Sequence, residues 1–294
     1  METEALTKRY GGARGIEEVT LSVARGEVFG FLGPNGAGKT TTIRTLLDLL
    51  HPTSGSARLF GLDSRRDSVA IRARLGNLPG DFSYGPPALT GRALLELFAR
   101  LRGMEDLSTA EALAERFRAD LDRPLGQLSR GNRQKLGLAQ ALFHEPELLI
   151  LDEPTSGLDP LMQEEFLRVV AEQRDAGRTV FLSSHDLSEV ERVCDRVGII
   201  RDGRLVAVER IADLLGKSYR KVALRFAETV DPAELARLPG VSEVAATDGL
   251  IEFRAAGDLD AIVKAAARHT VVDVTVSRPT LEEIFVAYYS ESSP

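Results

Sequence analysis

The stretch that most constrains this chain is residues 31–42, which read FLGPNGAGKTTT. It contains the pattern G-x-x-x-x-G-K-[ST] as Gly33, Gly38, Lys39 and Thr40. Residues 27–32 before it read as a strand, and apolar residues at helical spacing follow it over 43–50. A strand, a glycine-rich loop and a helix in this order predict a phosphate-binding loop.

The residue types of this loop suit an anion. Glycines let successive backbone N–H groups curl around a phosphate without Cβ clashes, and the positive end of the following helix faces the same anion. Lys39 adds a mobile positive charge for the outer phosphates, and the Thr40 hydroxyl can ligate Mg²⁺. We therefore expect a nucleoside triphosphate here.

Length and composition narrow the class of protein. The chain has 294 residues, enough for one large and one small domain, with an ordinary soluble composition of 43% hydrophobic residues. A net charge of −7 without a basic run argues against nucleic acid as a partner. We find no membrane-spanning or secretory segment, so we expect a cytoplasmic protein. The single cysteine, Cys194, excludes an intrachain disulfide and is expected to be buried.

Strand and helix patterns alternate through the first two thirds of the chain. Residues 1–32 are rich in strand patterns, and a helical pattern runs from about 82 to 143. Short apolar runs at 147–152 and 179–184 are typical of strands buried on both faces. The sequence thus predicts an α/β fold with a mainly parallel sheet covered on both faces.

Two local patterns predict the secondary structure after residue 184. Asp186 and Glu189 have the spacing of a capping box at the start of a helix. Residues 197–208 fold back through Arg201-Asp202-Gly203, which predicts a β-hairpin. The segment 78–87, rich in proline and glycine, is expected to be a long loop.

The pattern changes after residue 215. We place a linker at 213–220, between a domain at 1–212 and a smaller one at 221–294. The smaller one reads strand, helix, strand, strand, helix, strand and a last helix over 281–289, which is typical of an α+β unit of the ferredoxin-like kind.

A carboxylate pair follows the apolar run at 148–151. Asp152 ends that strand, where it can hold Mg²⁺ beside Thr40. Glu153 comes next and points elsewhere because neighbouring side chains on a strand alternate. We assign Glu153 to the attacking water, as general base or orienting group.

At this point the chain closely resembles the ATP-binding-cassette (ABC) family. Residues 30–202 contain its motifs in order: Walker A at 33–40, the signature at 128–132, Walker B at 148–153, the D-loop at 156–159 and the switch histidine His185. Residues 221–294, with 280–285 reading TLEEIF, are similar to the tail of ATPase subunits of ABC-2 type multidrug and antibiotic exporters. The resemblance implies a P-loop NTPase cassette with an N-terminal antiparallel β-subdomain and a helical subdomain.

The resemblance also implies roles for individual residues. Glu153, His185 and Lys39 would be catalytic, and Thr40, Asp152 and Asp81 would serve the metal. The nucleotide would be bound by residues from four parts of the chain, Tyr10 stacking on adenine: Tyr10, Gly33, Pro34, Asn35, Gly36, Ala37, Gly38, Lys39, Thr40, Thr41, Ser129, Gly131 and Asp159. The other histidines, His51, His144 and His269, are read as capping or packing residues.

The signature makes sense only in a pair of cassettes. Ser129 and Gly131 open a helix, so their N–H groups and hydroxyl form a second anion site. In the family, ATP lies between Walker A of one subunit and the signature of the other, in a head-to-tail dimer. Asp159 would connect the two sites, and we expect a homodimer ahead of a heterodimer.

Two departures from the family pattern are visible. The signature reads LSRGN in place of LSGGQ, so Arg130 replaces a glycine and Asn132 a glutamine; we expect Arg130 to point outward or to pair with phosphate. The loop at Gly80 lacks the glutamine that the family uses for Mg²⁺ and for sensing the membrane partner. Asp81 substitutes for it, or the metal depends more on Thr40 and water.

The sequence-based conclusion is an ATPase that uses ATP and Mg²⁺ to drive export through a separate ABC-2 type permease, on the inner face of the membrane. One alternative is a soluble cassette acting on the ribosome or in DNA repair. Such relatives usually carry two cassettes or a long coiled-coil insertion, and this chain has one signature. A catalytically idle cassette is the other alternative, and intact Lys39, Asp152, Glu153 and His185 argue against it.

Overall fold

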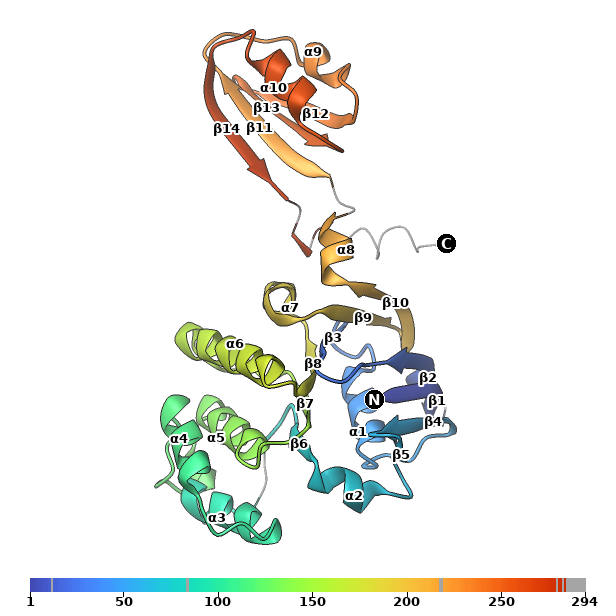
Figure 1. Cartoon of the computed structure of the whole chain (residues 1–294), viewed down its shortest axis with the longest axis vertical. Coiled ribbons are helices and arrows are strands. Elements are labelled where there is room, and N and C mark those ends of the chain that lie inside the picture. The colour runs from blue at the N-terminus through green and yellow to red at the C-terminus, as the bar shows by residue number, and fades with distance from the viewer. Residues whose placement is uncertain (12, 83–84, 217–218, 279, 282, 284–294) are drawn as a thin grey trace. The chain divides into compact units, whose positions relative to one another are not determined.

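The computed structural model describes residues 1–11, 13–82, 85–216, 219–278, 280–281 and 283. The chain forms two compact units, Met1–Arg210 and Ile211–Pro294. Figure 1 shows the elements of both units.

A six-stranded sheet with the order β10-β9-β3-β8-β7-β6 is the centre of the first unit. Its strands are β3 (Val28–Leu32), β6 (Leu75–Leu78), β7 (Leu148–Asp152), β8 (Thr179–Ser184), β9 (Arg196–Arg201) and β10 (Arg204–Arg210). All pairs are parallel except β9–β10, which is a hairpin. Its turn holds Asp202 at φ 51° and Gly203 at φ 79°, so the predicted hairpin is confirmed.

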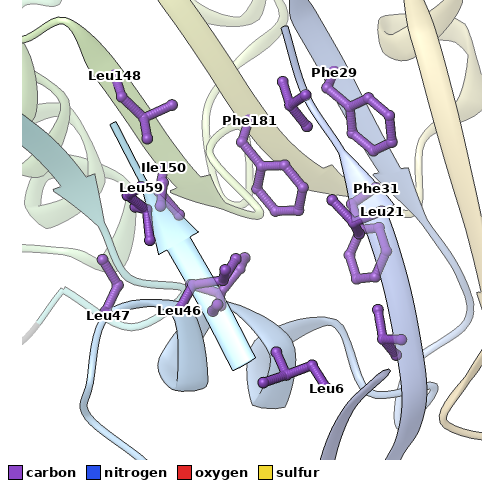
Figure 2. Close-up of a cluster of buried hydrophobic side chains, with 14 of the residues drawn as sticks. Leu6, Leu21, Phe29, Phe31, Leu46, Leu47, Leu59, Leu148, Ile150 and Phe181 are labelled. Atoms are coloured by element: carbon purple, nitrogen blue, oxygen red, sulfur yellow. The ribbon is translucent and has the colours of Figure 1, made fainter. Parts of the chain in front are cut away.

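The antiparallel subdomain and α1 (Lys39–Leu46) lie on one face of this sheet (Figure 1). The subdomain has the order β2-β1-β4-β5, with β1 (Glu2–Tyr10), β2 (Ala13–Ser22), β4 (Ser54–Leu59) and β5 (Leu62–Asp63). The apolar core between the layers contains Phe29, Phe31 and Phe181 (Figure 2). The rings of Phe29 and Phe181 stack with centroids 5.8 Å apart. The phosphate loop therefore directly follows a strand, β3, that is buried in this core.

Three helices cover the other face: α5 (Arg130–Leu142), α6 (Pro160–Asp175) and α7 (Leu187–Val193). Gly30 faces this side, since a Cβ built on it would lie 2.7 Å from Val190 and 3.0 Å from the sulfur of Cys194. Close packing of α7 on β3 requires glycine there. Cys194 is buried, as expected, and burial raises the pKa of its thiol.

The helical part of the first unit contains α3 (Gly91–Leu101), α4 (Ser108–Arg116), the 3₁₀ turn η1 (Leu125–Gln127) and α5; a short α2 (Ser68–Ala73) precedes β6. Helix α3 begins at Thr90, whose hydroxyl accepts the N–H of Ala93. It buries Leu94 and Leu95. This is the predicted helical subdomain.

The second unit confirms the ferredoxin-like prediction. Its elements are α8 (Ile211–Gly216), β11 (Arg220–Phe226), α9 (Pro232–Ala236), β12 (Val241–Thr247), β13 (Leu250–Ala255), α10 (Asp260–Ala266) and β14 (Val271–Ser277). The sheet order is β12-β13-β11-β14 and every pair is antiparallel. Strands β11 and β13 bury apolar side chains in a separate core with α9 and α10.

Two boundaries differ from the sequence-based ones. The units divide after Arg210, and α8 occupies the first part of the segment 213–220 that was predicted to be a linker. Ile211 and Leu214 are buried one helical turn apart, which stabilises this helix. Of the predicted last helix, 281–289, only Leu281 and Glu283 fall within the described residues; Leu281 is buried and Glu283 pairs with Lys221.

Candidate functional site

The loop between β3 and α1 has a backbone that only glycine suits. Gly36 and Gly38 have φ values of 82° and 113°, in the region that L side chains rarely adopt. A Cβ on Gly33 would lie 2.4 Å from the carbonyl oxygen of Ile200. The loop curls tightly for two independent reasons, left-handed torsions and close packing against β9.

The curled loop encloses a pocket of about 190 Å³, which we call the loop pocket. It is lined by Gly15, Pro34, Asn35, Gly36, Gly38, Lys39, Thr40, Thr41 and Glu153. Gly33 and Ala37 are buried behind it, and the Ala37 N–H donates to the Pro34 carbonyl at 3.1 Å. Most of the residues predicted from Walker A thus meet at one cavity.

Thr40 and Asp152 come together at its edge. The Thr40 hydroxyl donates to one Asp152 carboxylate oxygen at 2.8 Å, and the Ser183 hydroxyl donates to the other at 2.5 Å. Ser183 belongs to β8, next to β7 in the sheet. Asp152 is 2% exposed, so its orientation is fixed by these two hydroxyls.

This donor set fits Mg²⁺. A hydroxyl and a carboxylate are hard oxygen ligands, and Mg²⁺ bound with phosphate usually takes only one or two protein carboxylates beside water. Among the described residues, no three His, Cys, Asp or Glu side chains gather as a metal cluster. A metal at Thr40 and Asp152 would thus need phosphate oxygens to complete its shell.

Glu153 is held in a conformation that is rare for its residue type. Its φ is 49°, in the left-handed region, which costs of order 1 kcal/mol or more for a residue with a Cβ. Its N–H donates to the Ser183 carbonyl at 3.1 Å, and its carbonyl accepts from the Gln134 amide at 3.1 Å. Contacts from β8 and α5 fix the backbone, and strain of this kind is concentrated at functional sites.

The Glu153 carboxylate joins two positive or protonatable groups. Lys39 Nζ lies 3.1 Å from its Oε1, and His185 Nδ1 lies 2.6 Å from its Oε2. Lys39 is 6% exposed, and its Nζ also donates to the Gly33 carbonyl at 2.6 Å. The His185 side chain is 62% exposed, so its ring lies at the solvent-facing end of these contacts. The three predicted catalytic residues therefore form one chain of contacts.

Glu189 is a buried residue that contacts Thr155 and Ser184, which are close in sequence to Glu153 and His185. The Thr155 hydroxyl donates to its carboxylate at 2.9 Å, and the Ser184 hydroxyl lies at 3.4 Å. Burial raises the pKa of Glu189, while the Thr155 hydrogen bond opposes the shift. The predicted capping box is therefore half wrong: Asp186 caps α7 through the N–H groups of Ser188 and Glu189, but the Glu189 side chain turns to Thr155.

Tyr10 lies beside the loop pocket. Its ring is 42% exposed, and Lys8 Nζ lies 5.5 Å from the ring centroid. Gly15, which lines the pocket, approaches Tyr10 so closely that a Cβ on it would lie 3.3 Å from the ring. A flat purine could rest on this ring with its phosphates in the loop.

Asp81 is exposed and does not line the loop pocket. Its neighbour Gly80 comes closer to the metal ligand, since a Cβ on Gly80 would lie 3.3 Å from the Asp152 carboxylate. The loop at 78–82 therefore passes next to Asp152, with Asp81 one residue further along.

The signature lies at the start of α5. Ser129 accepts the N–H of Asn132 at 3.2 Å as the helix cap, and the Asn132 side chain accepts the N–H of Asp120 at 2.7 Å. Ser129 and Gly131 are not among the residues that line the loop pocket. One chain thus presents two separate helix N-termini, at α1 and at α5, and helix N-termini favour anions.

The signature and the D-loop of the same chain touch each other. A Cβ on Gly131 would lie 2.4 Å from the Gly157 carbonyl oxygen, and the Arg130 guanidinium donates to the Ser156 hydroxyl at 2.7 Å. Arg130 is exposed, in line with the outward orientation expected for it, and it also binds the D-loop. Glycine at 131 permits a close approach of two backbones.

Asp159 begins α6 and connects to α5. Its side chain accepts the N–H of Met162 at 3.1 Å, and Lys135 Nζ lies 3.4 Å from its carboxylate. The Met162 hydrogen bond, followed by Lys135, lowers the pKa of Asp159. The carboxylate is 53% exposed and remains available to a second molecule.

Three residues of the site were missed by sequence reasoning: Ser183, Gln134 and Gly15. Ser183 orients Asp152, Gln134 holds the backbone at Glu153, and Gly15 lines the pocket. The sequence signal for Ser183 was a polar residue within an apolar strand. The sequence signal for Gln134 was a glutamine at a helical position expected to face the core. Gly15 gave no signal.

The remaining histidines have structural contacts. His51 lies 3.2 Å from Asp48, and His269 lies 3.0 Å from Glu234. His144 Nε2 lies 3.0 Å from the Leu75 carbonyl oxygen, so it carries the proton and donates. Burial, and then the charge of Arg102, lowers the pKa of His144 to about 4.

Comparison with known proteins places this site in a family. Residues 16–156 match the model of the ABC transporter family, and residues 215–289 match the C-terminal domain of DrrA1-3-like ATP-binding proteins. The daunorubicin resistance ATP-binding protein DrrA3 of Streptomyces coeruleorubidus is 39% identical over 95% of this chain and 92% of its own length. The bacitracin transport ATP-binding protein BcrA of Bacillus licheniformis is 41% identical over 75% and 72%.

Solved structures agree on the fold. An ATP-binding subunit of an ABC transporter aligns with a TM-score of 0.66 and 31% identity, over 72% of this chain and 90% of that one. A dimeric ATP-binding cassette bound to ADP and Pi aligns with a TM-score of 0.65 over 71% and 98%; at 23% identity it supports the fold alone. No helix in the described part of the chain is long and apolar enough to cross a membrane.

The cassette fold, the motif order and the matches over nearly the whole chain agree with one another. The chain belongs to the ABC transporter family of ATP-binding proteins, in the group that carries the DrrA1-3-like C-terminal domain.

Proposed function

We propose that this chain hydrolyses MgATP at a seam between two copies of itself and so drives export through a separate ABC-2 type membrane subunit, from the cytoplasmic face. The observation that carries the proposal is the chain of contacts Lys39–Glu153–His185 beside the Thr40–Asp152 pair. In this proposal it supplies a base, two positively charged or protonatable groups and a metal-ligand pair beside the loop pocket.

The loop residues bind the triphosphate. The N–H groups at the start of α1 and the Lys39 ammonium face the outer phosphates, where Lys39 offsets their negative charge. Because Lys39 is buried, its charge acts in a medium of low effective dielectric. Tyr10 supplies an apolar platform for the base.

Glu153 orients the attacking water. Phosphate oxygens compete for Lys39 and for His185, so both can leave the carboxylate when the nucleotide binds. The freed carboxylate then accepts a proton from water at the end of β7. His185 donates to the terminal phosphate and stabilises the charge that develops during transfer.

Thr40 and Asp152 would hold Mg²⁺, and the loop after β6 passes next to Asp152 at Gly80. The metal would neutralise charge on the phosphates. Ser183 keeps Asp152 in place at 2.5 Å, so the ligand does not have to reorient.

The signature of a second copy completes the site. Ser129 and Gly131 do not line their own chain's loop pocket, yet they present a second helix start suited to phosphate. Two copies arranged head to tail would bring each signature to the other's nucleotide. The contacts of Gly131 and Arg130 with the D-loop transmit this closure to Asp159.

Export is supported by the names of the relatives. BcrA is a bacitracin transport protein and DrrA3 a daunorubicin resistance protein. The corresponding cargo here is an antibiotic-like compound, recognised by the membrane subunit. These names favour transport over a role on the ribosome or in DNA repair.

A Glu153→Gln variant tests the proposed chemistry. The amide keeps the shape of the side chain but cannot accept the proton, so we expect MgATP to hold a stable dimer that size-exclusion chromatography detects. The double variant Lys39→Ala/Glu153→Gln is the control and should stay monomeric, because it binds the triphosphate weakly. A monomeric Glu153→Gln protein at saturating MgATP would contradict the proposal.

A further inference from the structure

The sheet of the second unit has two edges, β12 and β14, and they differ in kind. An edge strand exposes backbone N–H and C=O groups that can pair with another chain, and proteins usually protect such edges with bulges and charges. One edge here has this protection and the other lacks it.

The β12 edge is protected. Its register with β13 shifts between Ser242 and Ala245, so the strand bulges there. Glu243 within the bulge has a φ of 50° and forms an ion pair with Arg254. A neighbouring strand could not add to this edge without disturbing both features.

The β14 edge is regular and apolar. Residues 273–277 pair with β11 without a register shift, and the bulge lies at the start of the strand, next to Phe226. Val272, Val274 and Val276 are 61%, 55% and 46% exposed. Asp273 is the only charged residue in the strand. Nothing in the described part of the chain pairs with the outer side of β14.

Val274 and Val276 continue the apolar core. They pair with Leu224 and Val222, and paired residues point to the same face of a sheet. Leu224 and Val222 are each 2% exposed beneath α9 and α10. The core face of the sheet thus extends onto β14 without cover from the described residues.

We infer that β14 pairs with β14 of a second copy of this chain, antiparallel and centred on Val274. In that register Val274 meets Val274, Val272 meets Val276, and Asp273 meets Thr275. The valines of both copies form one apolar stripe, and each carboxylate faces a hydroxyl instead of a second carboxylate. The strand is self-complementary about a two-fold axis.

The partner of β14 is taken to be a second copy of this chain because the proposed function requires two copies. The inference therefore rests on that function. Two copies held at their nucleotide sites are tethered to each other, which raises the effective concentration of one β14 edge for the other. A short edge pairing that is too weak on its own can then form.

Disulfide formation tests the pairing in the full-length chain. In Val274→Cys, the two thiols would lie within the Cα separation that a disulfide needs, so mild oxidation should give a covalent dimer. Val263→Cys is the matched control, because Val263 is 61% exposed, close to the 55% of Val274, but lies on α10. Cys194 is buried and does not compete.

The expected result is a covalent dimer with Val274→Cys that exceeds the Val263→Cys yield at least tenfold. Equal yields, or none, would overturn the inference. Protection of the Val274→Cys thiol from a small reagent, lost on truncation after Glu283, would instead assign residues 284–294 as the cover of β14.

The two proposals can fail separately. A Glu153→Gln dimer without a Val274→Cys disulfide would leave the cassette mechanism intact and remove the β14 pairing. A disulfide at Val274→Cys without a Glu153→Gln dimer would retain the edge pairing and remove the composite nucleotide site.

Discussion

At Gly131 the backbones of the signature and the D-loop lie close together. A Gly131→Ala side chain would lie 2.4 Å from the Gly157 carbonyl oxygen, so one of the two backbones must move. We expect kcat for ATP hydrolysis to fall at least tenfold while the fold, followed by circular dichroism, persists. Arg130→Ala removes the bond to Ser156 without a clash and should cost less. An unchanged kcat in Gly131→Ala would show that this contact is not needed.

Tyr10 is the residue whose role depends most on the nucleotide base. Loss of a stacked ring costs about 1–3 kcal/mol per base, so Tyr10→Ala should raise the ATP KM about tenfold with little change in kcat. Tyr10→Phe keeps the ring and should behave like the natural protein in the same steady-state assay. A Tyr10→Ala variant with an unchanged KM would remove Tyr10 from the site.

His144 links helix α5 to strand β6, and its protonation should weaken that packing. The pKa of about 4 in the folded state lies below the ordinary value of 6.5, so the folded state binds the proton less well than the unfolded one. Stability is therefore full above pH 6.5 and falls as the pH drops toward 4. At pH 5 the loss should be about 2 kcal/mol, as an upper figure for a partly solvated ring.

Urea unfolding of the natural chain and of His144→Gln, at pH 7 and pH 5, measures this effect. The glutamine variant can still donate to the Leu75 carbonyl but does not titrate, so its free energy of unfolding should fall less between the two pH values. Equal losses in both proteins would assign the pH dependence to other groups.

Elements with strong local signals were predictable from sequence. The buried runs at β7 and β8 and the hairpin turn at Asp202-Gly203 follow from apolar continuity and from turn chemistry. Local patterns could not reveal where a side chain turns in three dimensions. Glu189 has the spacing of a capping residue, but a buried hydroxyl at Thr155 competes for its carboxylate, and that contact depends on the tertiary fold.

At the scale of the molecule, the motifs predicted which residues meet but not how they are held. The loop pocket contains most of the residues expected from Walker A, together with Glu153. The left-handed backbone of Glu153, the Ser183 support of Asp152 and the Arg130–Ser156 bond join segments far apart in sequence. The two units divide after Arg210, two residues before the predicted end of the first domain. The chain passes from β10 into α8 without a change in composition that would mark this boundary.

If each nucleotide site is built from two chains, two variants that are each defective in a different half of the site should complement each other. Ser129→Asp keeps a good helix cap but puts a negative charge at the second anion site, and Lys39→Ala removes the phosphate-binding lysine. Each variant alone should hydrolyse ATP poorly. A mixed dimer contains one site with an intact Lys39 from one chain and an intact Ser129 from the other.

The decisive measurement is the ATPase rate of the two variants before and after mixing. We expect mixing to restore activity that neither protein has alone, and we expect the restored rate to rise more steeply than linearly with protein concentration. Activity that stays at the sum of the two separate rates, or a natural protein whose specific activity is the same at every concentration, would contradict a site shared between two chains.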